Sequence, residues 1–102
     1  MRGNVLNKVN FIKELSEVIV KYHGGVNSVE YSVFKHKETE HMEEFLVITY
    51  EGGAKSIRNC SGNSFSAVFE ELSRYLDTGY YSELEYFRNI ENDPNWIKVT
   101  FE

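Results

Sequence analysis

The chain has 102 residues, of which 11 are Lys or Arg and 16 are Asp or Glu, so its formal charge is −5. This length predicts one domain over residues 1–102, and the 15% aromatic content excludes an intrinsically disordered chain. The acidic balance disfavours direct binding to nucleic acid or to anionic membranes, because both need dense Lys and Arg. No apolar run approaches the roughly 20 residues of a membrane span, the N-terminus lacks a signal-peptide core, and the single cysteine excludes an internal disulfide. We therefore expect a cytoplasmic protein.

The first predicted element is an amphipathic helix over residues 4–22. Its apolar residues recur three or four positions apart and form one stripe: Val5, Val9, Ile12, Leu15, Ile19 and Tyr22. Lys8 and the other charged residues of the helix are expected mostly off this stripe. Gly24-Gly25 ends the helix, because glycine takes the left-handed conformation of a helix C-terminus without a steric clash.

Patterns of period two then predict three strands. Residues 29–34 alternate as in a half-buried strand, and residues 35–42 are polar, which predicts a loop or a frayed hairpin end. The run FLVITY over residues 45–50 predicts a central strand. Gly52-Gly53 favours a tight turn into a third strand over residues 54–59. The short loops predict an antiparallel meander.

A second helix follows a polar loop. Asn63 or Ser64 can accept a hydrogen bond from its first backbone amides, and Thr78-Gly79 ends it. Its apolar stripe consists of Phe65, Val68, Phe69, Leu72 and Leu76.

A third helix is predicted from Ser82, because Ser82 and Glu85 have the spacing of a capping box. Three of its apolar residues are expected to face inward, namely Leu84, Phe87 and Ile90. Pro94 and its polar neighbours then form a turn, and the alternation over residues 96–101 is compatible with a short edge strand. The predicted fold is α+β, with a three-stranded antiparallel sheet and the order helix, three strands, two helices.

The negative charge lies in the C-terminal part of the chain. Residues 1–63 carry eight basic and eight acidic residues, whereas residues 64–102 carry three basic and eight acidic ones. Tyrosines lie among these carboxylates, and tyrosine is common at interfaces because it buries a large area at little entropic cost. We predict a partner-binding surface that consists of Glu70, Glu71, Asp77, Tyr80, Tyr81, Glu83, Glu85, Tyr86, Glu91 and Asp93. The alternatives are a solvated surface that maintains solubility and aromatic rings that cover a small core.

Three features could indicate catalysis or ligand binding. Cys60 and a histidine could form a nucleophile pair, but no local motif supports this and a packed thiol is the simpler interpretation. Residues 36–41 hold two histidines and two carboxylates, yet their spacing matches no standard zinc site. Residues 52–56 join two predicted strands, whereas a phosphate loop leads into a helix. We expect a non-enzymatic protein without a metal or a cofactor.

The order helix, three strands, helix over residues 4–77 resembles the double-stranded-RNA-binding domain. That family contacts phosphates through a lysine cluster at the start of its last helix, and the matching residues 62–67 contain no lysine. Glu70 and Glu71 follow instead. The resemblance therefore extends to topology, and the missing lysines argue against RNA binding.

The whole chain resembles the small Cas9-inhibiting anti-CRISPR proteins of phages and mobile elements. The residues that carry this resemblance are Glu70, Glu71, Asp77, Glu83, Glu85, Glu91 and Asp93. The resemblance implies an inhibitor whose acidic face occupies the basic surface of Cas9 that reads the PAM duplex, so the implied partner is a basic nucleic-acid-binding protein. The alternative is a homo-oligomeric structural or regulatory protein of a phage or mobile element, in which the C-terminal strand pairs between the subunits of a homodimer.

Overall fold

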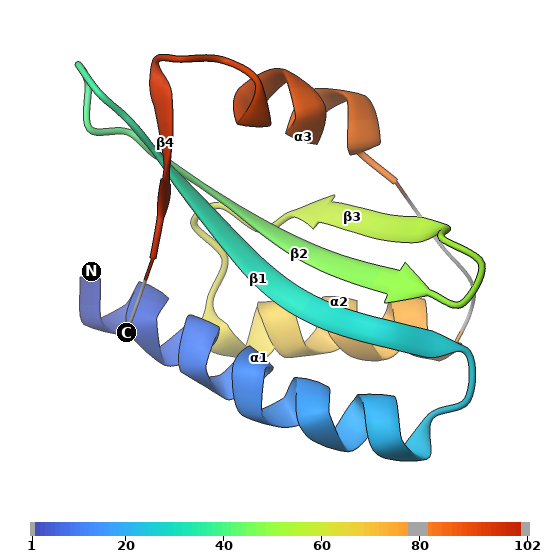
Figure 1. Cartoon of the computed structure of the whole chain (residues 1–102). Coiled ribbons are helices and arrows are strands. Elements are labelled where there is room, and N and C mark those ends of the chain that lie inside the picture. Colours follow the sequence, from blue (N-terminus) through green and yellow to red (C-terminus); the bar gives the residue numbers. More distant parts are fainter. Residues whose placement is uncertain (1, 78–81, 101–102) are drawn as a thin grey trace.

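The computed structural model describes residues 2–77 and 82–100, and Figure 1 shows their arrangement. Within these ranges the chain forms three helices and one four-stranded antiparallel sheet, which confirms the predicted α+β class. The elements in chain order are α1 (Arg2–Tyr22), β1 (Val26–His36), β2 (Met42–Tyr50), β3 (Lys55–Asn59), α2 (Phe65–Asp77), α3 (Leu84–Glu91) and β4 (Trp96–Val99). The strand order across the sheet is β3-β2-β1-β4.

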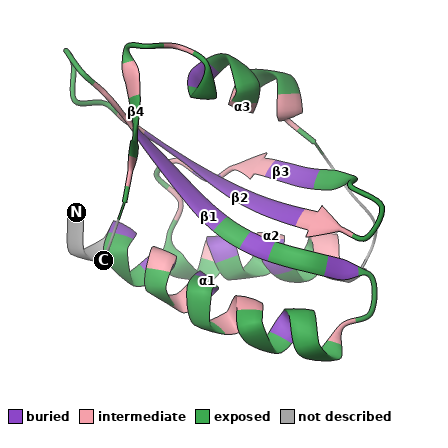
Figure 2. Ribbon diagram, in the orientation of Figure 1, coloured by how far each residue is buried: buried purple, intermediate pink, exposed green. Residues whose placement is uncertain are grey.

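Helices cover both faces of the sheet. α1 and α2 lie next to each other on one face, and α3 lies on the other (Figure 1). Leu46 and Ile48 of β2 belong to the core under α1 and α2, whereas Phe45 and Val47 belong to the core under α3. Burial on both faces explains the apolar run that begins at Phe45, and Figure 2 shows residues 43–48 of β2 as buried and the last two residues of the strand as intermediate.

The sheet has one strand more than the predicted meander. Trp96–Val99 forms β4, which pairs with residues Val33–His36 of β1. Residues 35–42 form the end of a hairpin, one of the two predicted possibilities, but the strands extend further than expected, because Lys35 pairs with Met42 and only residues 37–41 lie outside the strands. β1 therefore has a neighbour on each side at its C-terminal end, and this pairing outweighs the polar composition of the segment.

Two local signals act as the sequence predicts. Gly52 and Gly53 have φ angles of +90° and +95° in the turn between β2 and β3. At the start of α2, Ser64 Oγ accepts a hydrogen bond of 3.2 Å from the backbone N–H of Ala67. These contacts confirm the glycine hairpin and the serine cap.

The predicted capping box of α3 is wrong. The helix begins at Leu84, its N-cap residue is Glu83, and no side chain caps it. Ser82 instead lies beside Ile57 in an isolated parallel bridge, and the N–H of Glu83 donates to the carbonyl oxygen of Ile57 at 2.9 Å. Pairing with the edge of β3 thus sets the start of the helix and leaves Glu85 out of the cap.

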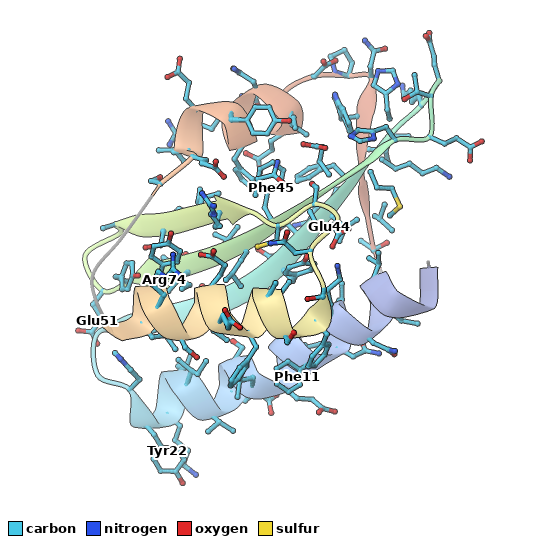
Figure 3. The ribbon with its side chains drawn as sticks, turned by 180° about the vertical axis from the view of Figure 1, so that it is seen from behind. Phe11, Tyr22, Glu44, Phe45, Glu51 and Arg74 are labelled. Atoms are coloured by element: carbon cyan, nitrogen blue, oxygen red, sulfur yellow. The ribbon has the colours of Figure 1, made fainter. Side chains whose placement is uncertain are left out.

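Four side chains depart from the predicted stripes. Tyr22, expected on the apolar stripe of α1, is 75% exposed at the end of the helix. Lys8, expected off the apolar stripe, is only 2% exposed. Phe65 and Phe69 of α2, expected inside, are 40% and 44% exposed. Both rings contact Phe11 of α1, at centroid distances of 4.7 and 5.9 Å, and Figure 3 shows Phe11 between the two helices. The two phenylalanines therefore join α2 to α1 rather than to the sheet.

Candidate partner-binding surface

The predicted partner-binding residues are divided between the two helical layers. Glu70 and Glu71 lie on α2, whereas five others lie on or beside α3 on the opposite face of the sheet: Glu83, Glu85, Tyr86, Glu91 and Asp93. Asp77 is the last residue of α2, but its side chain lies outside the described part of the structure, as do Tyr80 and Tyr81. The seven described side chains do not share one continuous surface.

Arg58 of β3 lies near a glutamate from each helical layer. Its Nε is 3.9 Å from Glu71 Oε2, and its Nη1 is 4.0 Å from Glu83 Oε1. Because the Arg58 side chain is 35% exposed, solvent weakens these ion pairs, and each stabilises the fold by at most about 1 kcal/mol. Glu83 also accepts a hydrogen bond from the backbone N–H of Asn59. Glu71 and Glu83 are thus directed toward β3 rather than outward.

α3 has five exposed residues: Glu85, Tyr86, Arg88, Asn89 and Glu91. We call the three of them that were predicted to bind a partner, Glu85, Tyr86 and Glu91, the α3 surface, and Arg88 adds one positive charge on the same helix. All three residues are exposed, and Tyr86 has 46% of its surface accessible. Asp93 is half-buried and its Oδ1 accepts a hydrogen bond of 2.9 Å from the N–H of Asn95, which stabilises the turn before β4. The α3 surface therefore combines two outward carboxylates with one aromatic ring.

Glu43 of β2 holds Tyr86 in place. The Tyr86 hydroxyl and Asn59 Nδ2 both donate to Glu43 Oε1, and His41 Nε2 lies 2.7 Å from Glu43 Oε2. Burial by itself would raise the pKa of Glu43, but the hydrogen bonds from Tyr86, Asn59 and His41 prevail and lower it. The bond to Glu43, together with burial, raises the pKa of Tyr86 to about 12. The ring is therefore oriented by the protein itself.

A second carboxylate, Glu44, lies on the opposite face of β2 (Figure 3). Lys8 Nζ is 2.6 Å from Glu44 Oε1 and 2.9 Å from the carbonyl oxygen of Asn63, while the Tyr31 hydroxyl donates to the same Glu44 oxygen at 2.6 Å. Burial, and then the hydrogen bond to Glu44, raise the pKa of Tyr31. Lys8, Tyr31 and Glu44 are buried, and the network links α1, the sheet and the loop before α2.

Cys60 and His36, the residues considered for catalysis or metal binding, are each held in packing or turn contacts. Cys60 is completely buried, and burial raises its pKa to about 11, so the thiol is neutral at pH 7. His36 Nδ1 accepts hydrogen bonds from the backbone N–H groups of Glu38 and Thr39, which stabilise the hairpin turn. Across residues 2–77 and 82–100, no three His, Cys, Asp or Glu side chains are grouped as metal ligands.

The sequence interpretation did not identify Glu43, Glu44 and Lys8 as functional or structural partners. The position of the two carboxylates in the sequence is a signal that could have identified them. Adjacent residues of a strand point to opposite faces of the sheet, and both faces of β2 are apolar. Two buried carboxylates in such a strand each need donors. Lys8 lies between Val5 and Ile12 at helical spacing, so its position on α1 could have suggested one of these donors.

No helix in the described part of the chain is long and apolar enough to cross a membrane. Comparisons with protein-family models, with curated proteins and with solved structures find no match to this chain.

Proposed function

We propose that the protein is a non-enzymatic inhibitor that binds a basic, nucleic-acid-binding surface of another protein through the α3 surface, with Cas9 as the first partner to test. One observation carries this proposal. Glu85 and Glu91 are exposed on the same helix as Tyr86, whose hydroxyl is already bound to Glu43. A partner of this kind is intracellular, so the proposal places the protein in the cytoplasm.

The two kinds of side chain have different roles in the proposed complex. Exposed carboxylates attract a basic surface over a distance and mainly increase the association rate, which falls as salt screens the charges. Tyr86 is pre-oriented, so less conformational entropy is lost when a partner covers its ring. Arginine is the preferred contact for such a pair of groups, because it binds carboxylates and stacks on aromatic rings.

DNA cleavage by several Cas9 orthologues, measured with increasing amounts of the protein, tests the proposal. In the double variant Glu85→Gln/Glu91→Gln, the loss of two exposed ion pairs costs about 1 kcal/mol in total, which raises the half-inhibitory concentration about fivefold. The wild type is expected to lose inhibition more steeply than the variant as salt increases.

Glu70→Gln provides the matched control, because Glu70 is an exposed carboxylate on α2 in the opposite layer. It removes one negative charge and is expected to inhibit like the wild type. Unchanged cleavage with every orthologue would remove Cas9 as the partner. Equal inhibition by the wild type and the double variant would contradict the role of the α3 surface.

A second candidate function, that of a homodimeric structural or regulatory protein, is favoured by the outer edge of β4. In the described part of the chain, β4 is the last strand of the sheet on this side, and its Ile97 is 52% exposed. Light scattering after size exclusion is expected to show a dimer that Ile97→Lys dissociates. Val18→Lys on α1 is the control, because Val18 is also 52% exposed. A monomer at all concentrations would contradict this candidate.

A further inference from the structure

Some large apolar side chains of α1 remain exposed next to α2. Phe11, Val18 and Tyr22 are seven and four residues apart, the spacing that keeps side chains on one side of a helix. Phe11 is half-buried, whereas Val18 and Tyr22 keep most of their surface in contact with solvent. The Tyr22 ring points away from the rest of the molecule, as Figure 3 shows. α1 therefore has a second apolar side, besides the one that packs on the sheet.

α2 widens this apolar side. Phe65 and Phe69 are exposed, and both rings contact Phe11. α1 and α2 lie side by side and run in the same direction (Figure 1), and Tyr22 lies about 16 Å further along α1 than Phe11. Apolar residues that gather on one face, rather than being exposed singly, mark a site of protein–protein contact. The α1–α2 face, as we call it, consists of five residues: Phe11, Val18, Tyr22, Phe65 and Phe69.

Two charges beside this face make α1 complementary to itself. Glu14 follows Phe11 by three residues and Lys21 follows Val18 by three, so both charges lie on the same flank, seven residues apart. Both side chains are exposed, and in the described ranges neither forms an ion pair within the chain. Opposite charges in this arrangement pair two antiparallel copies of one helix, because Glu14 of each copy then meets Lys21 of the other.

One alignment of two copies brings all of these groups together. When two copies of α1 lie antiparallel with Glu14 opposite Lys21, Val18 of one lies opposite Val18 of the other to within about 3 Å along the axis. Within the same tolerance, Phe11 lies opposite Tyr22. The Tyr22 ring of each copy therefore lies next to the other's Phe11, which is in contact with Phe65 and Phe69. Each contact occurs twice, as a twofold axis requires, and the aromatic rings are the kind of anchors that dominate interfaces.

We propose that the protein forms a twofold-symmetric dimer through the α1–α2 face, with the two copies of α1 antiparallel. The face offers about ten residues from each copy, fewer than the roughly 20–30 of a standard interface, so the dimer is weak and forms at micromolar concentrations or above. The α3 surface lies on the other side of the sheet and stays free in both copies (Figure 1). The inference therefore goes beyond the proposed inhibitor function.

Sedimentation velocity between about 5 and 500 µM protein tests the proposal, and the wild type is expected to change from monomer to dimer over this range. Glu14→Lys places lysine opposite lysine, and Lys21→Glu places glutamate opposite glutamate, so each is expected to weaken the dimer at least about tenfold. An equal mixture of these two variants is expected to dimerise again, with one copy of each. The double variant Glu14→Lys/Lys21→Glu, which exchanges the two charges, is expected to dimerise like the wild type.

Lys13→Glu is the matched control for charge, because Lys13 is an exposed lysine on another side of α1 and the substitution makes the same change as Lys21→Glu. It is expected to leave the dimer unchanged. Val18→Lys brings two ammonium groups together at the twofold axis and is expected to dissociate the dimer, whereas Ile97→Lys leaves it intact. A dimer paired through β4 gives the opposite results for Val18→Lys and Ile97→Lys, so the two variants distinguish the two interfaces.

Three results would overturn the proposal. The first is a monomer up to about 500 µM. The second is a dimer that Glu14→Lys and Lys21→Glu leave as stable as the wild type, or that does not form again when these two variants are mixed. The third is a dimer that Ile97→Lys dissociates and Val18→Lys does not. Failure of the Cas9 assay has no bearing on the proposal, because the variants of the α3 surface leave the α1–α2 face unchanged.

Discussion

Replacement of Lys8 by methionine tests the importance of the buried network under α1. The substitution retains most of the apolar stem and removes the ammonium group, which lies 2.6 Å from Glu44 Oε1. Glu44 then keeps the Tyr31 hydroxyl as a donor but loses the nearby positive charge, and its side chain is only 7% exposed. Removal of one member of a buried ion pair costs about 3–5 kcal/mol, a large part of the roughly 5–15 kcal/mol by which a domain is stable.

Urea unfolding followed by circular dichroism measures this loss. Lys13→Met is the matched control, because Lys13 is an exposed lysine of the same helix, and we expect its free energy of unfolding to stay within about 0.5 kcal/mol of the wild type. In Lys8→Met/Glu44→Gln, the unpaired buried charge is also removed. This double variant is expected to be more stable than Lys8→Met alone.

Two results would refute the reasoning. A loss below about 1 kcal/mol in Lys8→Met would show that Glu44 does not depend on the lysine charge. Strict additivity of the two single substitutions in the double variant would show that the two side chains are not energetically coupled, despite their separation of 2.6 Å.

Three further predictions concern Glu43, Tyr86 and Cys60. Tyr86→Phe removes one donor to Glu43, so it is expected to cost about 1 kcal/mol in urea unfolding at pH 7, and an NMR titration should find the pKa of Glu43 closer to 4.5. Because the pKa of Glu43 is lowered in the folded state, its stabilising effect is present above about pH 4.5 and is lost as the pH falls through the folded value. Stability should therefore decline less steeply in acid for Glu43→Gln than for the wild type, and parallel curves would contradict the assigned hydrogen bonds. Burial and a pKa of about 11 should leave Cys60 unreactive toward a disulfide reagent in the native protein and reactive in urea, whereas rapid native labelling would show an accessible thiol.

The fold could be predicted where a local pattern decides the structure. Helical spacing identifies α1, the run of residues 45–50 identifies β2, and the glycine pair identifies the turn after it. β4 could be predicted only as compatible with an edge strand, because four residues are too few for a clear pattern. Its formation depends on pairing with Val33–His36, far away in the sequence.

The candidate site was less predictable, because the sequence pattern does not show which face of a sheet a helix covers. The acidic residues of α2 and α3 are close in sequence, but the two helices lie on opposite faces. Glu83 is directed toward Asn59 by the bridge between Ser82 and Ile57, a contact with no local signal. Glu85 and Glu91 are exposed on the α3 side and Glu70 on the α2 side, and the helical spacing of the sequence alone could not separate these exposed carboxylates from Glu71 and Glu83.

The adjacent carboxylates Glu43 and Glu44 also have a consequence for how β2 aligns with its neighbours. If β2 moved by one residue along β1, each carboxylate would turn to the opposite helical layer, away from its own donors, and Phe45 would turn with them. A shift in either direction would therefore remove hydrogen bonds and packing contacts from both helical layers at the same time. An insertion or a deletion within β2 is therefore expected to be far more damaging than one in the turn at residues 37–41, because an exposed turn can change its length while the paired residues of β1 and β2 keep their partners.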